Sequence, residues 1–90
     1  MDNQNQNQDP NNINIQLNEM VASGVYCNLA LVNHSPSEFV VDFIQLMPGV
    51  QQANVRSRVI LAPIHAKRVL TALQQNIANY EQQFGEIKEL

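Results

Sequence analysis

Two stretches of the chain, residues 25–33 and 38–46, carry apolar side chains at both odd and even positions. A strand with one face in water alternates apolar and polar residues, so strands that are apolar on both sides need both faces covered. The stretches read VYCNLALVN and EFVVDFIQL, and their branched and aromatic residues favour β-structure. The pattern therefore predicts two strands of a sheet that requires a cover on each face.

Two flanking segments predict further strands. Ile13–Leu17 alternates aliphatic with polar residues, which predicts a first strand with one buried face. Asn54–Leu61 predicts a fourth strand, reached through a type II turn with Pro48 second and Gly49 third. Pairing Leu46 with Asn54 then places two oppositely charged residues, and two pairs of apolar residues, across from one another. These pairs are Asp42 with Arg58, Val41 with Val59, and Phe39 with Leu61.

One long helix is predicted from Pro63 to Phe84, because proline suits the first helical position and no other breaker occurs before Gly85. Its apolar residues recur at alternating spacings of four and three, which gives a seam along one side of the helix. The seam consists of Ala66, Leu70, Leu73, Ile77, Tyr80 and Phe84.

The predicted fold is α+β: a four-stranded antiparallel sheet followed by one long C-terminal helix, in two layers, forming a dimer. We expect residues 1–12 to form a disordered tail rich in Asn and Gln, residues 13–85 to form one domain, and residues 86–90 to form a frayed tail. The helix covers one face of the sheet, so we expect the cover of the other face to come from another chain; the alternative is a helix that wraps enough of both faces by itself. A domain this small also buries only about 60% of its unfolded surface, which favours association.

Composition limits the partners. The net charge of −3 argues against a general attraction to nucleic acid or anionic lipid. Cys27 is the single cysteine, so neither an intramolecular disulfide nor a multi-cysteine zinc site is expected. No apolar run approaches the roughly 20 residues of a membrane span, and the first residues lack the features of a secretory signal. We expect a cytoplasmic protein.

The residues capable of chemistry do not form a recognisable catalytic pattern. His34 and His65 are the two histidines, and a metal site would have to add carboxylates without any ligand spacing. The hydroxyl, imidazole and carboxylate within residues 34–38 are better explained as a turn than as a triad. Cys27 lies on an apolar strand and is better explained as a core residue. No glycine-rich phosphate loop occurs. We therefore expect no enzyme activity, no cofactor and no metal.

Four of the five basic residues lie within thirteen positions: Arg56, Arg58, Lys67 and Arg68. They allow a solvated or internally paired role, a protein-binding patch, or phosphate binding. Asp42 offers Arg58 an internal partner, and no aromatic residues are interleaved for base stacking, so nucleic acid is the least favoured of the three.

Five ordered segments resemble the bacterial domain-of-unknown-function family 3467: GVYCNL (24–29), HSPSEFVVDF (34–43), MPGV (47–50), RSRVIL (56–61) and PIHAKR (63–68). Where that family has Thr before the proline and Glu after it, this chain has Ala62 and Ile64, which predicts a weaker helix start. The resemblance implies no agreed activity. Similar proteins are encoded beside the large RNA polymerase subunits in some bacteria, which implies an accessory subunit or partner of that assembly.

The sequence thus favours a non-catalytic interaction protein, a homodimer that docks on a larger bacterial assembly such as RNA polymerase. The expected charged contacts are Arg56, Arg58, Lys67 and Arg68, and the expected apolar contacts are Val40, Ile44, Leu46 and Ile60. The alternative is a chaperone that binds unfolded or extended peptides, because the order of strands and helix is similar to that of the export chaperone SecB.

Overall fold

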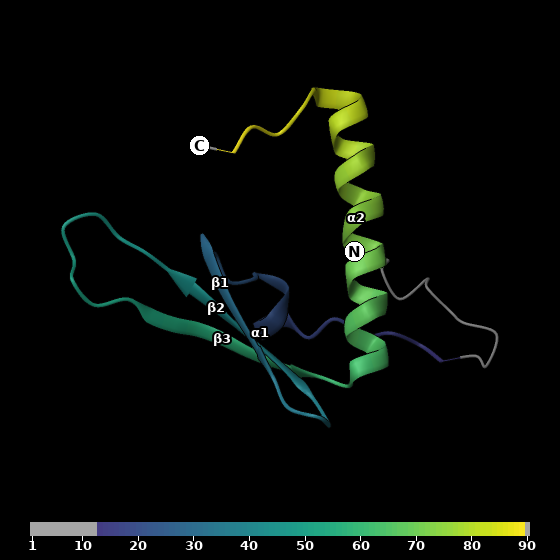
Figure 1. The fold of residues 1–90 in the computed structure, drawn as a ribbon, viewed down its shortest axis with the longest axis horizontal. Helices are drawn as coiled ribbons and strands as arrows, with labels where there is room; N and C mark the ends of the chain where they lie inside the picture. The colour runs from purple at the N-terminus through teal and green to yellow at the C-terminus, as the bar shows by residue number, and fades with distance from the viewer. Residues whose placement is uncertain (1–12, 90) are drawn as a thin grey trace.

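The structure of the protein is a computed structural model that describes residues 13–89. These residues form an α+β fold, an antiparallel sheet followed by a C-terminal helix, as the sequence predicts (Figure 1). The elements in chain order are α1 (Glu19–Ala22), β1 (Leu29–His34), β2 (Phe39–Gln45), β3 (Asn54–Leu61) and α2 (Pro63–Phe84). The predicted tail over residues 1–12 lies outside the described residues.

The sheet of the described residues has three strands in the order β1-β2-β3, so the prediction of four strands is wrong. Ile13–Leu17 is not part of the sheet, and its aliphatic side chains are about half exposed. Alternation supplies only a propensity for extended structure, and a strand needs a neighbouring edge to pair with. Here the chain turns into α1 directly afterwards, where the Asn18 side chain accepts the N–H of Met20 at 2.7 Å.

The strand predicted over residues 25–33 begins only at Leu29, and Asn28 explains the difference. The Asn28 N–H donates to the carbonyl of Ile44 at 3.0 Å. Its side-chain Oδ1 accepts the N–H of Leu46 at 2.7 Å, and its Nδ2 donates to the Leu46 carbonyl at 3.1 Å. The side chain thus takes the place of a backbone partner for Leu46, and the chain before Asn28 leaves the sheet.

The predicted register between β2 and β3 is correct for Asp42 with Arg58, Val41 with Val59, and Phe39 with Leu61. It shifts after Phe43, because Phe43 pairs with Ser57 and Ile44 with Val55, which leaves Arg56 as an extra residue on β3. A bulge of this kind bends and twists the strand that carries it. Asn54 therefore pairs with Gln45 and not, as predicted, with Leu46.

The turn between β2 and β3 has the predicted form: Val50 donates its N–H to the Met47 carbonyl at 3.2 Å, and Gly49 has a φ of 78°. A positive φ at the third position is what a type II turn requires. The helix α2 also has its predicted bounds. Its N-cap residue, Ala62, makes no side-chain capping bond, as the comparison with the family pattern predicts.

The long helix α2 does not lie flat on the sheet as the two-layer prediction requires; it leaves the end of β3 and stands away from it (Figure 1). The Cα radius of gyration is 16.2 Å, whereas a compact chain of this length has about 12 Å. Ile44 is the one buried apolar residue of the described chain, at 6% exposure. The single chain therefore has almost no closed core.

Candidate functional site

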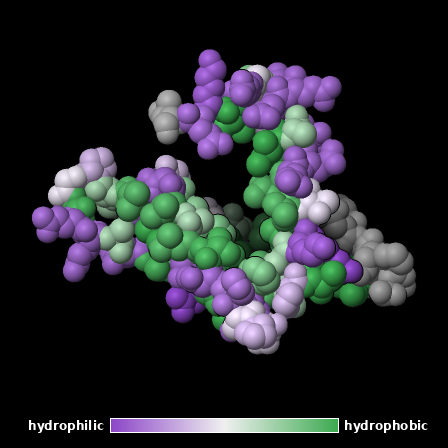
Figure 2. Space-filling model, viewed as in Figure 1, coloured by the Kyte–Doolittle hydropathy of each residue, from purple (hydrophilic) through white to green (hydrophobic). Residues whose placement is uncertain are grey.

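An apolar groove lies between the sheet and α2 (Figure 2). Its volume is about 590 Å³. On the sheet side it is formed by the odd-numbered residues of β2 and their cross-strand partners, a surface that we call the odd face. The lining residues of the odd face are Ala30, Val32, Phe39, Val41, Phe43, Val59 and Leu61, and α2 contributes Ala66, Val69, Leu70 and Leu73.

Strand periodicity explains why one side of the sheet lines the groove. Successive side chains of a strand point to opposite faces, and paired residues of antiparallel strands share a face. Val41 of β2 therefore points the same way as its partners Val32 and Val59. The pairing turns scattered apolar residues of three strands into one continuous hydrophobic surface.

The seam of α2 continues this surface past the end of the groove. Its first half, which includes Leu70 and Leu73, borders the groove, whereas Ile77, Tyr80 and Phe84 do not line it. The rings of Tyr80 and Phe84 lie 5.0 Å apart between centroids, and Phe84 is 66% exposed. Figure 2 shows the hydrophobic colour extending from the sheet arm along α2. In the described residues of one chain, both halves of the seam are largely exposed, and the second half lies outside the groove.

The opposite side of the sheet, the even face, carries three of the four apolar residues expected to contact a partner. Val40 and Ile44 lie on β2 and Ile60 pairs with Val40 on β3. Ile60 is 58% exposed, but Ile44, flanked by Leu29 and Val55, is buried and offers little contact area. Leu46, the fourth, lies just beyond β2, where its backbone is held by Asn28.

Asp42 and Arg58 form an ion pair on the even face. Asp42 is 7% exposed, and its two carboxylate oxygens accept hydrogen bonds from Nε and Nη2 of Arg58 at 2.6 and 2.8 Å. These hydrogen bonds, with the positive charge of Arg58, hold the pKa of the Asp42 carboxyl below its usual value and raise the pKa of Arg58. The internal role that the sequence allowed for Arg58 is therefore present, although its side chain is still 62% exposed.

The other basic residues do not gather around this pair into one patch. Arg56 is the bulged residue, and its Nη1 donates to Oε1 of Gln45. Lys67 and Arg68 lie in the second turn of α2 and are exposed. Between Arg56 and Leu61, β3 advances roughly 16 Å toward the start of α2, at about 3.3 Å per residue. The basic residues thus divide into a strand pair and a helix pair.

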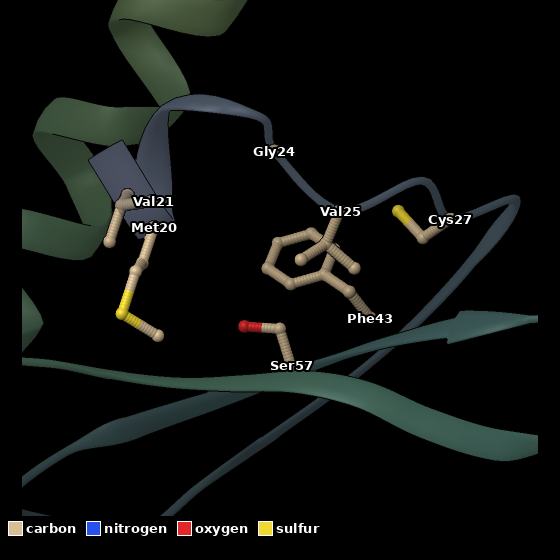
Figure 3. A pocket seen from close by; sticks show the side chains of 7 residues that line it. All are labelled: Met20, Val21, Gly24, Val25, Cys27, Phe43 and Ser57. Carbon is tan, nitrogen blue, oxygen red and sulfur yellow. The ribbon is translucent and has the colours of Figure 1, made fainter. Parts of the chain in front are cut away.

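A second cavity, of about 490 Å³, lies between the segment around α1 and the sheet (Figure 3). Met20, Val21 and Val25 approach it from one side, and Phe43 and Ser57 from the other. Cys27 lies at its edge, and the lining contains no histidine, lysine or carboxylate that could activate the thiol or the Ser57 hydroxyl. The arrangement is that of an open, mainly apolar cleft between loop and sheet.

Within residues 13–89, neither histidine belongs to a group of side chains that could bind a metal ion. The imidazole of His34 lies 5.4 Å from the ring of Phe39, its cross-strand partner. In the adjoining turn, the Ser35 hydroxyl is 3.3 Å from the Ser37 hydroxyl and also accepts the Ser37 N–H. In the described part of the chain, no three His, Cys, Asp or Glu residues are grouped so that they could hold a metal ion.

Sequence reasoning assigned the odd-face residues to a core under α2 and did not identify them as a binding surface. One signal was available in α2 itself, where Val69 to Tyr80 contains no charged residue. Solvent-facing helices usually carry charges on their outer side. A charge-free stretch of twelve residues indicates that this part of the helix is covered by protein.

The fold and the groove define an α+β protein with a three-stranded antiparallel sheet, a projecting C-terminal helix and an open apolar surface between them. The chain belongs to the family described as Protein of unknown function (DUF3467), whose model matches residues 1–89. This confirms the resemblance seen in the sequence. No curated protein and no solved structure matches the chain. Within residues 13–89, no helix has the length and apolar character to cross a membrane.

Proposed function

We propose that this protein is a non-catalytic protein–protein interaction module that forms a homodimer and docks on a larger bacterial assembly. The observation that supports this proposal is the exposure of apolar side chains on both faces of the sheet, where Ile44 is the single buried apolar residue among residues 13–89. Large exposed apolar surfaces are typical of sites that bind other proteins. A chain with this surface is most stable when other protein covers it.

The docking surface that we propose for the assembly is the even face with the neighbouring basic residues. Ile60 and Val40 supply apolar area there, and the exposed part of Arg58 supplies charge. The positive charge extends along β3 at Arg56 and onto α2 at Lys67 and Arg68. An interface with an apolar centre and charged residues at its rim is typical of specific complexes. The protein as a whole carries a net charge of −3, so these basic residues attract an acidic partner only at short range.

RNA polymerase is the candidate assembly, and this part of the proposal rests on the family resemblance alone. A tagged copy of the full chain, recovered from native cells and analysed by mass spectrometry, tests it. The expected result is enrichment of the large polymerase subunits over an untagged control. Recovery of a different stable complex would replace this candidate, and recovery of the chain alone would overturn the docking proposal.

Charge reversals test the docking surface itself. Arg56→Glu and Arg68→Glu should each weaken recovery of the partner, whereas Lys88→Glu makes the same change in charge outside the helix and should not. Arg58 is unsuitable for this test, because a glutamate at position 58 would face the negative charge of Asp42. Asp42 would also lose the two hydrogen bonds that Arg58 donates. Equal recovery with all three variants would eliminate the charged contacts.

A chaperone that holds unfolded or extended peptides is the second candidate, and the open groove is the observation that favours it. Extended or helical segments bind hydrophobic grooves with little sequence selectivity when the contacts are apolar side chains. Light scattering from several unrelated aggregating proteins separates the candidates. Suppression of all of them favours the chaperone, and no suppression favours a dedicated interaction module.

A further inference from the structure

We propose that α2 pairs antiparallel with α2 of a second copy of this chain, and that the second half of each helix fills the groove of the other copy. This inference rests on the proposed interaction role and names its first partner. It concerns the odd face and α2, whereas docking on a larger assembly uses the even face and the basic residues. Lys67 takes part in both proposals, but the docking test changes Arg56 and Arg68, which the helix pairing does not use. The two can therefore fail separately.

The seam of α2 has the same spacing in both directions, which suits antiparallel self-pairing. Measured from Gln75, its residues lie two, five and nine positions away on either side. Antiparallel alignment matches Leu73 with Ile77, Leu70 with Tyr80 and Ala66 with Phe84, and each match occurs twice. Knobs-into-holes packing requires that apolar positions meet in this layered way. The smallest seam residue, Ala66, faces the large ring of Phe84.

Charges beside the seam favour the antiparallel direction. Lys67, Gln74 and Glu81 follow one flank at intervals of seven residues. In the pair centred on Gln75, Lys67 of each copy lies near Glu81 of the other, with an axial offset of about 3 Å, and the two Gln74 side chains meet beside the two-fold axis. A parallel pair would bring this flank beside Val69, Asn76 and Gln83, where no opposite charges are available. Charged positions next to a seam set the partner and direction of paired helices.

Lys67 and Glu81 have no opposite charge three or four positions away in α2, the distance at which charges pair within a helix. Oε2 of Glu81 accepts the N–H of Ile87 at 2.9 Å, which holds the carboxylate near the helix end. A carboxylate has a second oxygen, and this one can accept a hydrogen bond from Nζ of Lys67 of the second copy. The uncharged stretch from Val69 to Tyr80 keeps like charges away from the centre of the pair.

The groove is where the second helix would lie. Leu70 and Leu73 border the groove, so a helix matched to them enters between α2 and the odd face. It would bring its own Ile77, Tyr80 and Phe84, which no sheet residue covers in the single chain, against the apolar lining. The pair would then lie between two sheets, and each helix would cover its own sheet with one half and the other sheet with the second half.

The exposed area is large enough for such an interface. The chain exposes 8169 Å², whereas a compact protein of this mass exposes about 5,300 Å². A standard interface buries about 800 Å² per partner. The excess surface therefore exceeds what a stable dimer needs.

Charge reversal in the full chain tests the pairing. Lys67→Glu places four acidic side chains along the flanks of the pair, and Glu81→Lys places four basic ones. Each variant should weaken the homodimer about tenfold, because two attractive contacts become repulsive. An equimolar mixture of the two variants should form a heterodimer at wild-type strength, and the double variant should recover the homodimer. Lys88→Glu is the matched control. Sedimentation velocity gives each dissociation constant.

Cysteine cross-linking tests the direction. In a Cys27→Ser background, Gln74→Cys lies beside the two-fold axis and should form an intermolecular disulfide. Ala66→Cys should not, because antiparallel pairing separates the two positions by about 27 Å along the helices. Cross-linking of Ala66→Cys with itself would show a parallel pair and overturn the proposal.

Three other outcomes would also overturn the helix-pairing proposal. The first two are a mixture of the charge variants that stays monomeric, and single variants that dimerise as tightly as the wild type. The third is a monomer that retains a peptide or an apolar small molecule in its groove. A monomer that still recovers its larger assembly overturns the helix pairing alone. Loss of the assembly from a protein that remains dimeric overturns the docking proposal alone.

Discussion

Asp42 and Arg58 face each other across β2 and β3 and are joined by two parallel hydrogen bonds, from Nε to Oδ1 at 2.6 Å and from Nη2 to Oδ2 at 2.8 Å. Paired hydrogen bonds of this form fix both position and orientation. The carboxylate is buried in the central strand and the guanidinium reaches solvent. The pair therefore aligns β2 with β3 on the side of the sheet that faces away from the groove.

This pair predicts a loss of stability in acid. The hydrogen bonds from Arg58 lower the pKa of Asp42 in the folded state below the usual value of 3.8. A lowered folded pKa stabilises the protein above the unfolded pKa, and this stabilisation is lost as pH falls through about 4 and on through the folded pKa. Urea unfolding between pH 7 and pH 2.5 should show that loss. Asp42→Asn should be less stable at pH 7 and depend less on pH, and equal pH dependence of the two proteins would contradict the prediction.

Ile44 and Ile60 test which apolar residues the single chain buries. Both lie on the even face, but Ile44 is buried and Ile60 is not. Ile44→Val should lower the free energy of unfolding by about 1 kcal/mol, as removal of a buried methylene does. Ile60→Val should change it by less than about 0.5 kcal/mol. Urea denaturation of both variants gives the comparison, and equal losses would show that Ile60 is also covered.

Gly49 tests the turn between β2 and β3. Its φ is 78°, and a Cβ there would meet no atom within 4 Å, so substitution changes the backbone energy without a steric clash. Gly49→Ala should destabilise the protein by about 1 kcal/mol, and Gly49→Asn by less, since asparagine tolerates this conformation better. Thermal unfolding of the two variants measures the difference. Equal stability of Gly49→Ala and the wild type would mean that the turn has another form.

Ala62 tests the start of α2. Its side chain cannot accept the free N–H groups of the first helical turn. Ala62→Ser supplies an acceptor and should raise the free energy of unfolding by about 1 kcal/mol. Ala62→Val alters size without an acceptor and serves as the control. A gain with valine, or none with serine, would show that the helix start does not limit stability.

The sequence predicted the elements whose signals are local. Proline at 63 and glycine at 85 bound α2, the Pro48-Gly49 pair defines a turn, and opposite charges at Asp42 and Arg58 indicate the β2–β3 register. The bulge at Arg56 could not be predicted, because no residue type at that position marks it. Val40, Ile44 and Ile60 share the even face, but the burial of Ile44 depends on its neighbours across two strands.

The two larger errors have a common cause. Alternation at Ile13–Leu17 and the seam of α2 each show that a side of the chain is apolar, but not which surface covers it. The alternation at Ile13–Leu17 was assigned to a strand of the sheet, and the seam of α2 was assigned to a helix that covers the sheet. In the structure, residues 13–17 remain outside the sheet and α2 stands away from it. Periodicity identifies a face to be buried, and only three-dimensional structure identifies its cover.

The central claim is that one chain cannot cover its own apolar sheet and helix, and that a second copy does so. The most direct test is the mass of the full chain by sedimentation equilibrium at micromolar concentration and neutral pH. We predict twice the chain mass of 10.1 kDa, with dissociation only on strong dilution. A mass of 10.1 kDa at every concentration would contradict this account.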